Sequence, residues 1–428
     1  MIISKHFLER ITLSLLIASA ATNVQASTTI SATASSPSAT STTSPGDSAC
    51  GSGYLGNGVC GWVSGASTRN THTILWSCFA VILLCTYKVV HNNVCSENEH
   101  LASWRQWPFY RKRLRALGVM VLAIMSPEFI SARAVSDWSE SRSICLRMKA
   151  KGYYCSMVQA HFINMGGLAT TTSEGLALLR WESLPELMDR YGWSEVVEQL
   201  PSDVDIKDRS KTDSFTATLA IVQSLWLVLE CIGRTVGGAS ISELELSTCA
   251  FVLCSLVSYG FWWNKPYDIE HRSVITFPES TQSHVLKVVS KHNLTSDYNN
   301  DRVRFEDDRT YPDIFRLYSW YIMASLAVLI VAIHLAAWNW LFPSHVELWL
   351  WRLSCLAVLP SCALLFIAGM GWTSDGHEAV FTLVAISVYM MSRLIIVVQI
   401  FLCFRKMPES VYTEVPWSYW DRYLPRLS

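Results

Sequence analysis

The chain has 428 residues, of which 50% are hydrophobic and 16% charged, and its mean hydropathy is +0.24. Soluble domains carry about 25% charged residues, so this composition indicates a membrane protein. The formal net charge of −1 gives no electrostatic basis for nucleic-acid binding. The thirteen cysteines include no Cys-x-x-Cys pair and the histidines no His-Glu-x-x-His spacing, so we expect no metal and no cofactor.

The first 26 residues resemble a secretory signal peptide. Lys5, His6 and Arg10 precede an apolar core at residues 11–21, and the stretch Val24-Gln25-Ala26 offers small residues for cleavage. An uncleaved anchor is the alternative. Residues 27–73 then form an exported stalk, which is rich in Ser and Thr and predicted to be disordered up to residue 48. Cys50 and Cys60 flank a glycine-rich loop and are expected to pair in an oxidising compartment.

Seven apolar segments follow the stalk, and each approaches the ~20 residues needed to cross a bilayer. They predict an all-α fold, an integral membrane bundle of about seven transmembrane helices over residues 74–404. Pro127 predicts a break at the end of the second segment, and tryptophans near several segment ends are typical of membrane interfaces. The segments are 74–90, 114–130, 215–232, 246–263, 319–342, 349–371 and 379–404.

The orientation follows from the positive-inside rule. With residues 27–73 exported, the Arg-rich stretch 91–113 and the tail 405–428 would lie in the cytosol, in a membrane of the secretory pathway. The two long loops, 135–214 and 264–318, would carry helices on the exported side. There Asn293 would be glycosylated, and Cys145 could pair with Cys155. Residues 153–179 are read as a re-entrant or interfacial helix, and an eighth crossing is the alternative.

Several short motifs follow one another in a specific order. They are His161-x4-Gly166-Gly167, Asp208-x-Ser210-Lys211-x-Asp213, Gln223-x2-Trp226-x3-Glu230-x3-Arg234, Trp262-Trp263-x-Lys265-Pro266-x-Asp268 and Val415-Pro416-Trp417-x2-Trp420. Together they resemble a family of fungal multi-pass integral membrane proteins of unknown function, over roughly residues 75–425. The resemblance implies a membrane class and a topology, and it implies no reaction.

A polar stripe runs along the helix predicted at residues 215–232. Thr216, Gln223, Glu230 and Arg234 fall on one face of it, and lipid-facing helices rarely carry such groups. The stripe would line a ligand pathway, with Arg393 of the last segment facing an acid such as Glu230 or Glu243. Alternatively, Glu230 and Arg234 form a helical ion pair at the membrane interface and Gln223 only bonds to another helix.

Charged residues also mark the expected exported mouth of this helix. These residues would either gather a substrate or simply form a solvated start of the helix, and both interpretations stay open. For Lys265, the alternative to a role in substrate gathering is that its ammonium group reaches the membrane interface. The mouth candidates are Asp208, Lys211, Asp213, Lys265 and Asp268.

Three functional classes remain open. The first is a transporter or receptor for a small ligand, and the second is a structural scaffold protein with a membrane-protein partner. The third, a membrane-embedded enzyme, has the least support because no Gly-x-Ser-x-Gly or P-loop motif occurs. All three share the lipid bilayer as a partner, and none involves nucleic acid.

Overall fold

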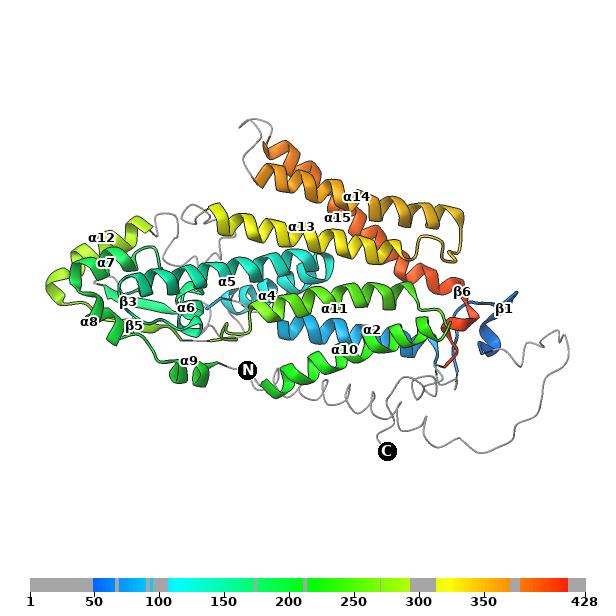
Figure 1. The fold of residues 1–428 in the computed structure, drawn as a ribbon, viewed down its shortest axis with the longest axis horizontal. Coiled ribbons are helices and arrows are strands. Elements are labelled where there is room, and N and C mark those ends of the chain that lie inside the picture. The colour runs from blue at the N-terminus through cyan, green and yellow to red at the C-terminus, as the bar shows by residue number, and fades with distance from the viewer. Residues whose placement is uncertain are drawn as a thin grey trace. The chain divides into compact units, whose positions relative to one another are not determined.

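The computed structural model describes residues 49–65, 69–89, 93–94, 107–172, 175–210, 214–269, 271–292, 313–369 and 378–414. These residues form two compact units. The first comprises Met1–Leu84, Val222–Val252 and Val328–Ser428, and the second comprises Cys85–Ile221 and Leu253–Ala327. Figure 1 labels the elements of both units.

The described chain is mostly helical, and most of its long helices are apolar (Figure 1). Four are long and apolar enough to cross a membrane, or five if one bent pair counts as a single span; the predicted seven exceed this number. The stretches are Thr218–Val236, Glu243–Phe261, His345–Ile367 and Ala379–Arg405. The apolar parts of the first and fifth predicted helices, Thr71–Thr86 and Tyr321–Leu335, are shorter. The helices are α2 (Thr71–Val89), α4 (Trp107–Met125), α10 (Ser214–Val236), α11 (Glu243–Phe261), α13 (Asp313–Leu335), α14 (His345–Gly369) and α15 (Glu378–Leu402).

The second predicted segment is broken at the position that Pro127 indicated. Helix α4 ends at Met125, and α5 (Pro127–Ala150) leaves it at an angle of 112°. Proline stands at the first position of α5, where its missing N–H costs no helical hydrogen bond. The Ser131 hydroxyl of α5 then donates to the Cys254 carbonyl of α11 at 2.9 Å. A polar helix thus continues the chain after α4, where the hydropathy pattern predicted one apolar crossing.

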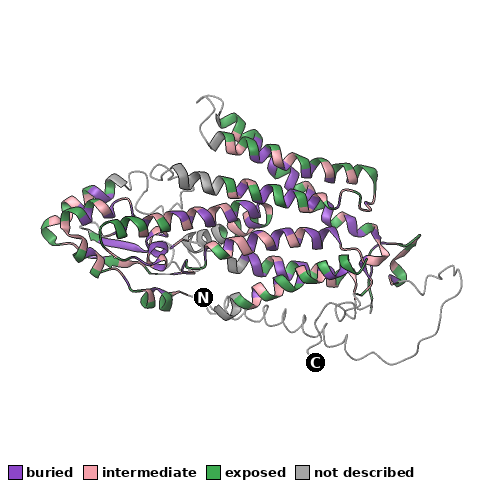
Figure 2. Ribbon diagram, viewed as in Figure 1, coloured by how far each residue is buried: buried purple, intermediate pink, exposed green. Residues whose placement is uncertain are grey.

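The second unit contains a folded region of short helices and strands around its own apolar core. Strand β3 (Leu168–Thr172) lies between antiparallel β4 (Gly175–Leu178) and parallel β5 (Ser273–Ile275). Leu168, Ala169 and Thr170 of this strand are buried, whereas Thr171 is exposed (Figure 2). The surrounding helices are α6 (Met157–Asn164), α7 (Leu184–Tyr191), α8 (Trp193–Glu198), α9 (Asp203–Arg209) and α12 (Gln282–His292).

This region corrects the interpretation of residues 153–179 as a re-entrant or crossing helix. Helix α6 has only eight residues and ends before Gly166, whose φ of +79° suits a left-handed turn. The β-branched residues Thr170, Thr171 and Thr172 then favour a strand. The fold is therefore mostly helical, but its two small sheets depart from the all-α prediction.

The second sheet lies in the first unit and joins distant parts of the chain. Strand β1 (Tyr54–Gly56) pairs with β2 (Val59–Cys60), which pairs with β6 (Met407–Pro408), both in antiparallel fashion. Three 3₁₀ turns flank these strands: η1 (Gly51–Gly53), η3 (Cys403–Arg405) and η4 (Glu409–Val411). A bilayer cannot separate strands that share hydrogen bonds. The sheet thus joins a segment expected to be exported to one expected to be cytosolic, and the side of the membrane on which each lies stays a prediction.

Candidate functional site

A largely buried ion network surrounds Arg69, the residue two positions before α2, and Glu230 is its most exposed member, with 34% of its side chain exposed. We call Arg69, Glu230, Arg234 and Glu245 the Arg69 network. Arg69 Nη1 donates to Glu230 Oε1 of α10 at 3.1 Å, and Nη2 donates to Glu245 Oε1 of α11 at 2.5 Å. Burial alone would lower the pKa of Arg69, but the two carboxylates outweigh it and raise the pKa above its ordinary value. Arg69 is therefore a permanently charged link between the two helices.

Glu245 owes its position to the start of α11. The backbone N–H and the hydroxyl of Ser242 both donate to Glu245 Oε2 at 2.9 Å, and the Glu245 N–H donates back to Ser242 Oγ at 3.3 Å. This is a capping box, which satisfies backbone donors at a helix start. One oxygen of Glu245 thus caps the helix, while the other binds Arg69.

Arg234, near the end of α10, binds backbone carbonyls of the C-terminal segment, residues 407–413. Its side chain is buried, with the residue only 1% exposed. Nη1 donates to the Thr413 carbonyl at 2.9 Å, and Nη2 donates to the carbonyls of Ser410 at 2.8 Å and Val411 at 2.9 Å. Nε and Nη2 also donate to the Ser240 carbonyl, at 3.2 and 3.1 Å. The guanidinium therefore clamps the C-terminal segment to the end of α10.

The residues of the predicted polar stripe face different partners and do not line one common path. Glu230 faces Arg69, and Arg234 faces the C-terminal segment, although the two residues are one helical turn apart. Gln223 is half-buried, and the side chain of Thr216 lies outside the described part of the structure. Arg393, expected to face Glu230 or Glu243, donates from Nε to Tyr389 Oη of its own helix at 3.1 Å.

The second unit holds another buried network, formed by Arg133, Asp137, Trp262 and Lys265, which we call the Asp137 network. Lys265 Nζ lies 2.6 Å from Asp137 Oδ2, and both side chains are 3% exposed. Trp262 Nε1 donates to the same oxygen at 3.0 Å, and Arg133 Nε lies 3.0 Å from Asp137 Oδ1. Burial lowers the pKa of Lys265, and Asp137 opposes this shift. Lys265 thus lies in a buried pair, where the sequence predicted an exposed mouth.

The other mouth candidates are only partly described. Asp208 is exposed in α9, and Asp268 has a φ of +47°. The end of α9 contacts the segment that carries Asp268, because the Tyr267 N–H donates to Ser210 Oγ at 3.0 Å. Lys211, Asp213 and the predicted glycosylation site Asn293 lie outside the described residues.

The four cysteines singled out in the sequence differ in state. Cys50 and Cys60 form a disulfide, whereas Cys145 and Cys155 are free thiols. The two thiols are neighbours, since their Sγ atoms lie 3.5 and 3.6 Å from the Ser156 carbonyl oxygen. The hydrogen bond with Cys145, together with burial, raises the pKa of Cys155. Within the described ranges, no three His, Cys, Asp or Glu side chains are grouped to hold a metal ion.

Sequence reasoning missed the central residue of each network. The sequence indicates a role for Arg69 only weakly, through its position as the last charged residue before an apolar helix. The Ser242-x2-Glu245 spacing is a recognisable capping box, and Arg133 and Asp137 have the spacing of a helical ion pair. Nothing local indicates that Asp137 also binds Lys265, which is 128 positions away.

Comparison with known proteins gives one family. Residues 54–301 match the model of a family described as a family of unknown function (DUF8562). No curated protein and no solved structure matches the chain. The match agrees with the expected membership of a family without an established activity, whereas the fungal origin implied by the motifs stays a prediction.

Proposed function

Since the chain belongs to DUF8562, a family of unknown function, we propose its role from its own contacts. It is a structural multi-pass protein of a secretory-pathway membrane. Its buried charges hold the chain together, and its partners are the lipid bilayer and another membrane protein. The signal-like first 26 residues and the Cys50–Cys60 disulfide support entry into the secretory pathway.

The lipid partner is supported by apolar side chains on the outer faces of the long helices. Helices α14 and α15 keep many exposed residues along their length (Figure 2). Soluble proteins do not leave contiguous apolar faces of this kind in water. The exposed residues include Val222, Leu225 and Leu229 on α10, Leu353 and Leu356 on α14, and Leu383 and Leu394 on α15.

The structural role rests on the contacts of Arg234. A residue that lines a ligand pathway must have donors available to the ligand, whereas Arg234 makes five hydrogen bonds to four backbone carbonyls of its own chain. Glu230, the other charged member of the predicted stripe, binds Arg69. Transport or sensing along α10 would require both residues to leave these partners, so it ranks second, and an enzymatic role ranks third.

Substitution of Arg234 tests this proposal. Arg234→Met keeps an unbranched stem but leaves the clamped carbonyls without their donor, at a cost of about 1–3 kcal/mol for each buried group that stays unpaired. We expect a several-fold loss of protein from the membrane fraction and rapid proteolysis of the C-terminal segment in what remains. Arg234→Lys should lie between Arg234→Met and the wild type, because a lysine keeps the charge but cannot reach carbonyls in several directions.

Gln223→Leu serves as the matched control on the same helix. It removes a polar group that is half-buried and should leave abundance and proteolysis unchanged. If Arg234→Met accumulated to the wild-type level with its C-terminal segment still protected, the structural role would be refuted. A ligand pathway along α10 would then become the leading interpretation.

A further inference from the structure

We infer that the C-terminal segment lies on the exported side of the membrane, together with the disulfide loop, residues 50–60. The chain then crosses the bilayer an even number of times, and residues 90–213 and 262–312 face the cytosol. The inference rests on the secretory-pathway location in the proposed function. It reverses the side expected for the C-terminal tail and for both long loops.

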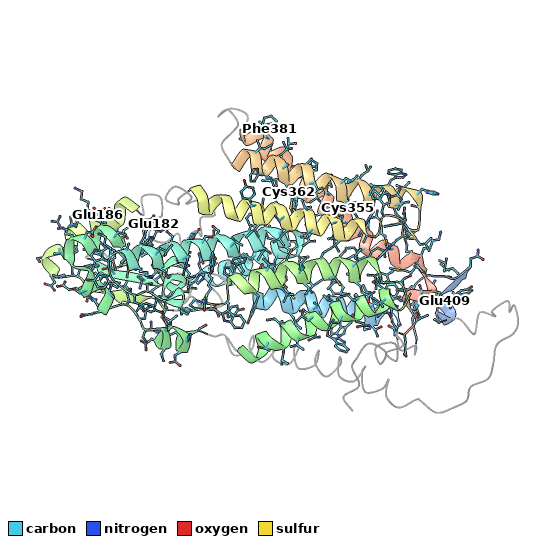
Figure 3. All side chains as sticks on the ribbon, viewed as in Figure 1. Glu182, Glu186, Cys355, Cys362, Phe381 and Glu409 are labelled. Carbon is cyan, nitrogen blue, oxygen red and sulfur yellow. A yellow bond between two sulfur atoms is a disulfide. The ribbon has the colours of Figure 1, made fainter. Side chains whose placement is uncertain are left out.

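The disulfide loop and the C-terminal segment form one folded piece. The strand register pairs Val59 with Pro408 and Cys60 with Met407. Beyond the strands, the Ala49 N–H donates to the carboxylate of Glu409 at 2.9 Å, and the Glu409 N–H donates to the Gly58 carbonyl at 2.9 Å. Figure 3 labels Glu409 beside these strands.

Residues on either side extend the same contact. Tyr412 Oη donates to the Gly61 carbonyl at 3.2 Å, and Arg69 Nε donates to the Val411 carbonyl at 2.7 Å. Every one of these bonds joins residues 49–69 to residues 407–413. Hydrogen bonds of this length cannot form across a hydrocarbon core of ~30 Å, so both pieces share one side of the membrane.

The disulfide indicates which side that is. Disulfides persist in oxidising compartments and are rare in the cytosol. Cys60 is both a disulfide partner and a residue of strand β2, so the compartment that oxidises it also contains β6. The exported side of the secretory pathway is such a compartment.

An even number of crossings must therefore separate Cys60 from Met407. Seven apolar helices occupy this interval, two of them (α2 and α13) with shorter apolar parts, so an odd number of them does not cross, and we assign this to a single helix. Helix α4 is the best candidate, because the chain bends by 112° directly after it into α5. Helix α5 is too polar to continue the span, since it buries Glu128 and Asp137 among its residues. The six crossings are then α2, α10, α11, α13, α14 and α15.

The distribution of positive charge agrees with this count over residues 237–344, whereas the cytosolic connection 370–377 contains no Lys or Arg and Arg405 and Lys406 would lie on the exported side. Cytosolic loops carry an excess of Lys and Arg. The two short exported connections, residues 237–242 and 336–344, contain no Lys or Arg. Residues 262–312, assigned to the cytosol, contain seven: Lys265, Arg272, Lys287, Lys291, Arg302, Arg304 and Arg309.

Glycosylation mapping of the full-length protein tests the inference. One variant carries an Asn-x-Thr acceptor appended after Ser428, a second carries an acceptor in the stalk between residues 27 and 48, and a third carries Asn293→Gln. The readout is the electrophoretic shift removed by an endoglycosidase. We expect glycans on the appended and stalk acceptors, and we expect Asn293→Gln to leave the mobility of the wild type unchanged.

The outcomes separate the two proposals. A glycan lost in Asn293→Gln, or a stalk acceptor that is glycosylated while the appended acceptor is not, would overturn the even-numbered topology. If the stalk acceptor stayed unmodified, both the secretory-pathway location and this topology, which depends on it, would be overturned.

As a second measurement, a membrane-impermeant maleimide applied to sealed right-side-out vesicles should leave Cys145 unlabelled until detergent is added. Labelling of Cys145 in intact vesicles would contradict the cytosolic position of residues 90–213.

Discussion

The Asp137–Lys265 pair allows a quantitative test of the buried networks. At 2.6 Å and an effective dielectric of about 20, two unit charges attract by roughly 6 kcal/mol. Desolvation of the two ions cancels several kcal/mol of this attraction, so the pair adds little net stability. Removal of one partner is different, because the remaining charge stays buried, and this typically costs about 3–5 kcal/mol.

The two single substitutions should not cost the same. Lys265→Met leaves Asp137 with Arg133 and with the Trp262 indole N–H, so its charge stays compensated. Asp137→Asn leaves the buried ammonium of Lys265 with an amide oxygen, Asn93 Oδ1, at 3.2 Å and with only the weaker attraction of Glu140. We therefore expect Asp137→Asn to reach the upper part of the ~3–5 kcal/mol range and Lys265→Met to fall below it. The double variant should be more stable than Asp137→Asn alone.

Thermal unfolding of the full-length protein in detergent measures these differences, with a thiol-reactive dye reporting exposure of buried cysteines such as Cys254. The matched control is Lys151→Met, which removes a pair with Asp189 at 3.0 Å whose side chains are 51% and 57% exposed. Surface pairs contribute about 0–1 kcal/mol, so the control should unfold at nearly the wild-type temperature. The reasoning fails if Lys151→Met shifts the transition as far as Asp137→Asn, or if the double variant is the least stable of the set.

Two further substitutions test local features of the fold. Gly167→Ala would place a Cβ atom 2.5 Å from the ring of Phe162 and should markedly lower the unfolding temperature. Gly260→Ala meets open space within α11, so it should raise the free energy of unfolding by about 0.5–1 kcal/mol. Equal effects at the two glycines would contradict this packing. Cys50→Ser removes the link to Cys60 across a separation of ten residues, a loss of roughly 2–3 kcal/mol. Dithiothreitol should abolish that difference from the wild type, and a difference that survives reduction would assign the loss to another cause.

Hydropathy predicted where the apolar helices lie, because each one is a local run of side chains that favour lipid. Pro127 likewise indicated the break after α4 through its own backbone geometry. Hydropathy could not indicate the path of the chain beyond this break, since a helix that crosses and a helix that bends back have the same composition. The same limit applies to Arg234: the carbonyls of Ser410 and Val411 lie 176 and 177 positions away, and every residue type offers a carbonyl. No side-chain pattern marks such a partner.

The charges of the Arg69 network explain why its polar residues tolerate burial. Arg69 and Arg234 both donate to the carbonyl of Val411, at 2.7 and 2.9 Å, so two positive groups converge on one backbone oxygen. Glu230 and Glu245 face Arg69 and bring the formal charge of the four side chains to zero. The acids and bases come from α10, from α11 and from the residues before α2; the two arginines bind the C-terminal segment, and the two acids bind Arg69. A loss of any one charge therefore leaves an uncompensated ion in a buried group, which ties the position of the C-terminal segment to the integrity of three helix ends.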